Sequence, residues 1–160
     1  MNVNQKAIDF ELQDENDKPF HLSSLAGSWV VLYFYPQDDT PGCTVEARSL
    51  RDAHDDISDL GAHVIGVSKD PVDSHAAFKA KYNLNFTLLS DPDRRVIRDY
   101  GVWGKKMFGH EGVLRKTFII DPDGVVVKVF GRVTPVRHGD QVIAELKRLQ
   151  TERTNTSKSA

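Results

Sequence analysis

SWVVLYFYPQDDTPGCTVEARSL, residues 28–50, contains an apolar run, a polar turn and the start of a helical pattern. The run from Trp29 to Tyr35 is continuously apolar and aromatic, which is typical of a strand buried on both faces of a sheet. Pro36 ends this run, and apolar residues then recur at helical spacing from about Thr44 to Leu60. A buried strand that leads into a helix predicts an α/β fold.

The flanking sequence extends this alternation of strands and helices. Residues 7–27 predict a β-hairpin, and Asp-Pro-Asp-Gly at 121–124 joins two apolar runs in a second hairpin. The helix after the second buried strand is predicted to have Asp73 or Ser74 as its N-cap. The remaining predicted elements are strands at 62–68 and 86–93 and helices within 68–84, 94–103 and 138–150. The order predicts a mixed sheet with helices on both faces.

Composition limits the classes of function that the chain can have. Its 160 residues predict one domain over 1–150, followed by a polar, disordered tail at 151–160. The net charge is -2 with both signs interleaved, which does not favour nucleic-acid binding. The longest apolar run is too short to cross a membrane, and the N-terminus lacks the pattern of a secretory signal. A single cysteine forms no internal disulfide, which favours the reducing cytoplasm.

Cys43, the only cysteine, follows a polar Thr-Pro-Gly turn at the start of a predicted helix. Free N–H groups and the helix dipole at such a position favour the thiolate, which is the nucleophilic form. A buried structural cysteine is the commoner alternative. The polar turn argues against it and predicts a thiol that points outward into a shallow pocket.

The segment YPQDDTPGCTVEA, residues 35–47, resembles the active-site segment of peroxiredoxins of the bacterioferritin-comigratory (PrxQ-like) group. That family pattern places a proline, a threonine and a cysteine at the spacing of Pro36, Thr40 and Cys43. Three further segments resemble the same group in the same order, at 64–82, 88–104 and 115–124. The resemblance therefore covers nearly the whole chain.

This resemblance implies a thioredoxin-like fold with a mixed central sheet flanked by helices and an added N-terminal β-hairpin. It also implies thiol-dependent reduction of hydrogen peroxide and organic hydroperoxides. Cys43 would be the peroxidatic nucleophile that becomes a sulfenic acid. Thr40 would bond the thiolate and a peroxide oxygen, and Pro36 would shield the sulfur from water. Arg115 would stabilise the thiolate and the charge that develops on the reacting oxygens.

Each of these roles has a simpler alternative. Thr40 could be a simple helix cap, and Pro36 could simply end the strand. Another basic side chain could take the place of Arg115 beside Cys43. Those other candidates are Arg51, Lys116 and Arg132. Glu46, one turn into the helix, either orients an arginine or is a solvated helix residue.

The chain departs from the family pattern at two positions. Many relatives carry a resolving cysteine five residues after the first, where this chain has Arg48, and others carry it in the next helix, where this chain has Lys79. The chain is therefore predicted to be a one-cysteine enzyme whose sulfenic acid is reduced by an external thiol. Thioredoxin, glutaredoxin, glutathione and Cys43 of a second molecule are the candidates. Arg48 and Lys79 either attract an acidic thiol or are ordinary solvated residues.

No cofactor or metal is expected. The six histidines lack the spacing of a metal motif and are interpreted as surface or packing residues. Residues 103–114 are predicted to form a mobile loop near Arg115. The chain is expected to be a monomer, with a dimer left open. A redox sensor and a fold with a relict thiol are the competing functions.

Overall fold

Strand β3 (Trp29–Phe34) is the centre of the fold, and all six of its side chains are buried. The computed structural model describes residues 1–106 and 109–159. β3 pairs in parallel with β4 (Ala62–Ser68) and antiparallel with β8 (Lys116–Ile120). β3 has a neighbouring strand on each side and apolar side chains over both faces. Its sequence is therefore continuously apolar and does not alternate with polar residues.

The sheet has seven strands in the order β2-β1-β5-β4-β3-β8-β9. The N-terminal hairpin of β1 (Glu11–Asp14) and β2 (Pro19–His21) joins one edge through β5 (Thr87–Ser90). β9 (Val126–Phe130) forms the other edge and pairs antiparallel with β8. The predicted mixed sheet and both predicted hairpins are confirmed.

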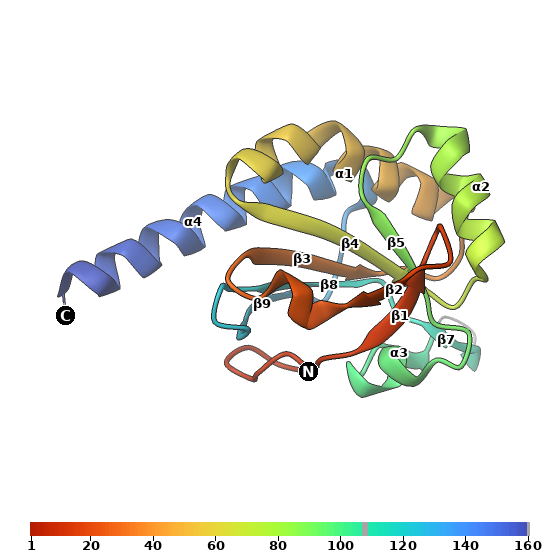
Figure 1. Ribbon diagram of the computed structural model, residues 1–160, viewed down its shortest axis with the longest axis horizontal. Helices are drawn as coiled ribbons and strands as arrows, with labels where there is room; N and C mark the ends of the chain where they lie inside the picture. Colours follow the sequence, from red (N-terminus) through yellow and green to blue (C-terminus); the bar gives the residue numbers. More distant parts are fainter. Residues whose placement is uncertain (107–108, 160) are drawn as a thin grey trace.

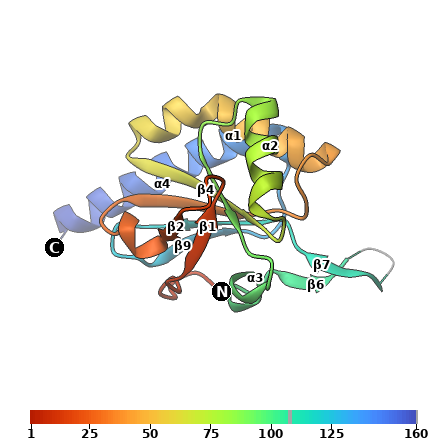
Figure 2. The ribbon, with the colours of Figure 1, turned by 45° about the vertical axis from the view of Figure 1, so that its right-hand side comes forward.

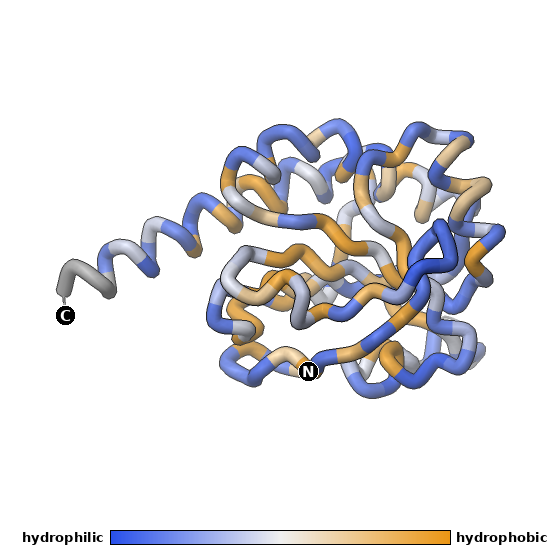
Figure 3. The backbone as a smooth tube through the Cα atoms, viewed as in Figure 1, coloured by the Kyte–Doolittle hydropathy of each residue, from blue (hydrophilic) through white to orange (hydrophobic). Residues whose placement is uncertain are grey.

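Helices cover both faces of the sheet (Figures 1 and 2). Helices α1 (Pro41–Asp59), α2 (Val72–Tyr82) and α4 (His138–Ser159) lie on one face, and a short 3-10 turn, η3 (Pro135–Arg137), precedes α4. The other face carries α3 (Arg95–Asp99) and the 3-10 turn η1 (Leu22–Leu25). A separate apolar cluster fills the space on each side, and Figure 3 shows the hydrophobic strands between more polar helices.

Two glycines let neighbouring elements approach closely. A Cβ atom added at Gly66 would lie 2.8 Å from the Tyr33 ring, so this glycine makes room for the tyrosine of the adjacent strand. Gly139, at the start of α4, would place a Cβ atom 2.7 Å from Ala53 of α1. The absence of a side chain there lets the beginning of α4 pack directly against α1.

The structure differs from the sequence predictions at several boundaries. Helix α1 begins at Pro41 and not at Thr44, because Thr40 is the N-cap and Pro41 and Gly42 already belong to the first helical turn. Pro71 is the N-cap of α2, in place of Asp73 or Ser74. The expected loop at 103–114 contains a two-stranded ribbon of β6 (Trp103–Lys105) and β7 (Glu111–Val113), while 107–108 lie outside the described residues.

Helix α4 continues to Ser159 and extends beyond the rest of the molecule (Figure 1). It therefore runs through the polar stretch for which the sequence predicts a disordered tail. The division of the chain into a domain over 1–150 and a tail over 151–160 stays a prediction. Among the helices of the described residues, none has the length and apolar character needed to span a bilayer.

Candidate active site

Cys43 lies in the first turn of α1, three residues after the N-cap Thr40. This position places the sulfur beside the unpaired N–H groups and the positive end of a 19-residue helix. Cys43 is only 1% exposed and packs in the apolar cluster between α1 and the sheet. The prediction of a thiol that points outward into a shallow pocket is therefore wrong.

Arg115 immediately precedes β8. Its side chain reaches Cys43, which lies 72 positions earlier in the chain. Its Nη2 donates a hydrogen bond to Cys43 Sγ at 3.4 Å, and its Nη1 donates to Glu46 Oε1 at 2.6 Å. A Cβ atom added at Gly42 would lie 3.1 Å from Nη2, so the glycine leaves space for the guanidinium. The structure thus brings Arg115, and not the alternative cations, to the sulfur.

Glu46 is fully buried one turn further along α1, and it contacts the same guanidinium as Cys43. Burial raises the pKa of Glu46 to about 7, although the positive charge and hydrogen bond of Arg115 oppose this rise. Its second oxygen, Oε2, has no hydrogen-bond partner among residues 1–106 and 109–159. Glu46 is therefore not a solvated helix residue; it and Cys43 share one cation.

His138, at the start of α4, lines the same buried region. Its Nε2 lies 2.8 Å from Thr117 Oγ1 and 3.8 Å from Glu46 Oε2. Burial lowers the pKa of His138 to about 4, so the ring is neutral near pH 7. The contact with Glu46 is consequently not an ion pair at that pH, and the Thr117 hydroxyl is free to donate to Nε2.

Thr40 and Pro36 lie three and seven residues before Cys43 in the chain, and the Thr40 side chain bonds within its own loop. The Thr40 hydroxyl donates to the carbonyl of Gln37 at 2.8 Å. It cannot donate to the thiolate at the same time, so its expected role requires the hydroxyl to rotate. Pro36 is half-buried between β3 and α1.

Two further residues of this region carry no signal in the sequence. Tyr33 is 1% exposed, and its hydroxyl lacks a hydrogen-bond partner within the part of the chain that the structure describes. Burial raises the pKa of Tyr33, and the negative charges of Glu46 and Cys43 raise it further. The pKa of Lys106 is lowered, mainly by burial. The negative charge of Cys43 opposes this shift, and the positive charges of Arg115 and Lys69 add to it. Lys106 is therefore a second cation, besides Arg115, that is electrostatically coupled to Cys43.

The two residues at the positions of the missing resolving cysteines differ in their surroundings. Arg48 is exposed on α1. Lys79 forms an ion pair with Glu15, which is itself 7% exposed. Lys79 thus ties α2 to the N-terminal hairpin and is not a free cation for an acidic thiol.

The family model described as "AhpC/TSA family" matches residues 3–129 of the chain. The chain belongs to the AhpC/TSA family. A protein of Coxiella burnetii called "Putative peroxiredoxin bcp" is 46% identical over 147 residues, which cover 90% of this chain and 97% of that protein. The predicted membership in the bacterioferritin-comigratory, PrxQ-like group of peroxiredoxins is confirmed.

Solved structures of this group have the same fold. A PrxQ mutant of Xylella fastidiosa superimposes with a TM-score of 0.90 at 32% identity, over 94% of this chain and 98% of that one. The bacterioferritin comigratory protein of Xanthomonas campestris, whose structures address its alkyl peroxide reduction activity, gives a TM-score of 0.82 at 37% identity, over 87% and 90%. The predicted thioredoxin-like fold is thereby confirmed.

Proposed function

We propose that this peroxiredoxin homologue is a one-cysteine thiol peroxidase that reduces hydrogen peroxide and organic hydroperoxides at Cys43. The observation that carries the proposal is the 3.4 Å hydrogen bond from Arg115 to Cys43 Sγ in the first turn of α1. A guanidinium and a helix N-terminus both stabilise negative charge on sulfur. A thiol with only a packing role needs neither.

The oxidative step is a displacement at the terminal oxygen of the peroxide. The Cys43 thiolate attacks this oxygen, so that a sulfur–oxygen bond forms while the oxygen–oxygen bond breaks. Sulfur loses two electrons, the peroxide gains them, and the departing alkoxide or hydroxide takes a proton from water. Arg115 stabilises the charge shared by the two oxygens, Thr40 rotates to bond the thiolate, and Pro36 keeps bulk water from the sulfur.

The reductive step uses thiols from outside the chain, because the sequence has no second cysteine. One thiol attacks the sulfenic acid, water leaves, and a mixed disulfide forms. A second thiol then releases reduced Cys43 and carries away the disulfide. Thioredoxin, glutaredoxin and glutathione are the candidate donors, and we assign the reaction to a monomer in the cytoplasm.

Peroxide consumption by the reduced protein tests this proposal. Thioredoxin and glutathione/glutaredoxin systems should be assayed side by side, with Cys43→Ser as the inactive control. Many turnovers with either system, absent in the variant, are expected. A single oxidation of Cys43 without turnover in any thiol system would instead identify a redox sensor, and no oxidation at all would refute both.

A further inference from the structure

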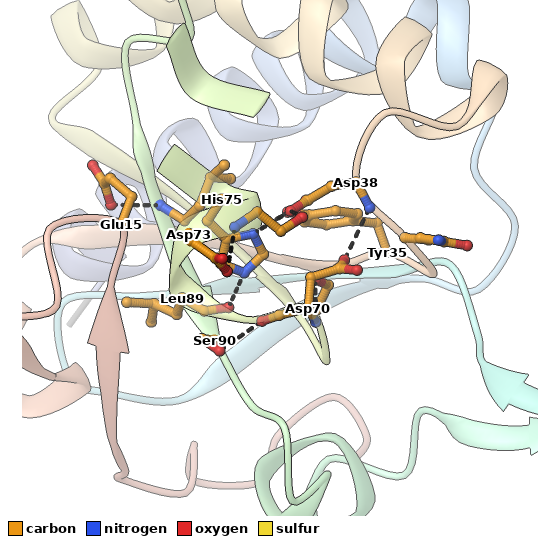
Figure 4. Close-up of polar contacts among 12 residues, drawn as sticks. Glu15, Tyr35, Asp38, Asp70, Asp73, His75, Leu89 and Ser90 are labelled. Atoms are coloured by element: carbon orange, nitrogen blue, oxygen red, sulfur yellow. Dashed lines mark hydrogen bonds and ion pairs between the residues drawn. The ribbon is translucent and has the colours of Figure 1, made fainter. Parts of the chain in front are cut away.

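A second buried polar cluster lies outside the Cys43 site, and Figure 4 shows its contacts. His75 of α2 is fully buried, and its Nδ1 lies 2.7 Å from Asp38 Oδ2. Asp38 also accepts hydrogen bonds from the Tyr35 hydroxyl at 2.6 Å and the Ser74 hydroxyl at 2.7 Å. We call Tyr35, Asp38, Ser74 and His75 the Asp38 cluster.

The hydrogen bonds of His75 fix where its protons lie. Nε2 faces the carbonyl oxygen of Leu89 at 2.9 Å, and a carbonyl only accepts, so this nitrogen carries a hydrogen. Nδ1 faces a carboxylate oxygen, and a proton must lie between these two atoms as well. Asp38 and His75 therefore form a buried, charge-assisted pair, which belongs to the stronger class of hydrogen bond.

These contacts account for the cluster without a metal ion. The ligand atoms of Asp38, Asp70 and His75 lie within 4.8 Å of one another, as the ligands of a metal would. Asp70 Oδ2, however, already accepts from the backbone N–H of Asp38 at 2.9 Å and from the Ser68 hydroxyl at 2.6 Å. Both nitrogens of His75 are likewise engaged, so no metal site is inferred.

The cluster acts on the loop between β3 and α1, which carries Pro36 and Thr40 toward Cys43. Asp38 is 8% exposed in this loop, and both its side chain and its backbone N–H bond to the segment around α2. The next residue, Asp39, bonds to Lys81 at 2.7 Å and to Tyr82 at 2.6 Å. Two consecutive aspartates therefore tie the loop to α2, one inside the protein and one at its surface.

We propose that Asp38 and His75 are positioning residues that hold the 36–40 loop against α2 and thereby fix the first turn of α1, which carries Cys43. This inference rests on the proposed function, since the loop position matters only if Cys43 reacts. With the loop held in this way, the first turn of α1 keeps Cys43 1% exposed and hydrogen-bonded to Arg115. Loss of the buried pair should leave the protein folded through its sheet but release the loop.

Two rate constants distinguish this role from a merely stabilising one. Rapid-quench mass spectrometry gives the rate at which peroxide oxidises reduced Cys43. Labelling by a bulky maleimide in native buffer gives the rate at which the sulfur becomes exposed. In Asp38→Ala we expect oxidation to slow about tenfold and labelling to quicken about tenfold, the effect of losing a charge-assisted hydrogen bond. A purely structural role would lower the melting temperature without changing both rates in opposite directions.

Asp39→Ala is the matched control, because it removes the exposed anchor of the same loop. Exposed ion pairs contribute little, so both rates should stay close to those of the wild type. Tyr35→Phe removes the 2.6 Å hydrogen bond to Asp38 and the 3.4 Å contact of the same hydroxyl with His75 Nδ1, and it serves if Asp38→Ala does not fold. It should shift both rates in the same directions, by about threefold.

Unchanged rates in folded Asp38→Ala or, failing that, in Tyr35→Phe would overturn the inference. Equal effects of Asp38→Ala and Asp39→Ala would overturn it too, because the buried pair would then have no special part. If wild-type Cys43 does not react with peroxide, the proposed function fails. The labelling rates would still decide whether the cluster holds the loop.

Discussion

The burial of Glu46 at the Cys43 site predicts that ionisation of this carboxyl makes the protein less stable as the pH rises. Its pKa in the folded protein is about 7, against an ordinary value of 4.5. Between these two values the folded protein holds a proton that the unfolded chain has lost. The free energy of unfolding therefore falls with rising pH, by about 1.4 kcal/mol per unit where the difference is complete.

The magnitude follows from the two pKa values. Between about pH 5 and about pH 8, ionisation of Glu46 should cost the folded state about 2.5 kcal/mol. Glu46→Gln removes this cost. It also changes the contact with Arg115, but the influence of Arg115 on the ionisation of Glu46 is already included in the folded-state pKa of about 7. The change in the stability difference between the two pH values is therefore the informative quantity.

Urea unfolding followed by tryptophan fluorescence measures this quantity. The comparison should be made in a Cys43→Ser background, which removes the titration of the thiol. Relative to its parent, Glu46→Gln should gain about 2.5 kcal/mol on going from about pH 5 to about pH 8. Glu145→Gln is the control, because the Arg148 hydrogen bond lowers the pKa of Glu145 and no such gain is expected. An equal Glu46→Gln difference at both pH values would refute the reasoning.

Three other outcomes are expected. Arg115→Met should slow the oxidation of Cys43 by peroxide about 100- to 1,000-fold in rapid-quench assays, whereas a matching change at exposed Arg132 should have little effect. Gly139→Ala should lower the free energy of unfolding by about 1–3 kcal/mol in urea, because the added methyl meets α1, while Gly131→Ala, with open space around it, should not. Excess peroxide without thiol should add two oxygens to Cys43 in intact-mass spectra; a gain of only one oxygen would show that the sulfenic acid resists further oxidation, and an unchanged mass would show that Cys43 is not oxidised.

Much of the architecture follows from local patterns in the sequence. The apolar run at Trp29–Phe34 predicts a central strand, and Asp-Pro-Asp-Gly predicts the β8–β9 hairpin, because strand burial and turn chemistry depend on residues close in the chain. The helix start near Cys43 is predicted for the same reason, although its first residue is three positions earlier than expected. The family resemblance supplied Arg115, which no local pattern singles out.

Local sequence patterns predict the strand–turn–helix that places the only thiol at a helix N-terminus, and the cysteine count excludes an internal resolving cysteine. Packing of distant elements buries this thiol, brings Glu46 to the guanidinium of Arg115, and pairs Asp38 with His75. The Asp38–His75 and Cys43–Arg115 contacts join residues 37 and 72 positions apart. Such contacts, and the burial that shifts their protonation, arise when the elements pack together, so no short stretch of the chain encodes them.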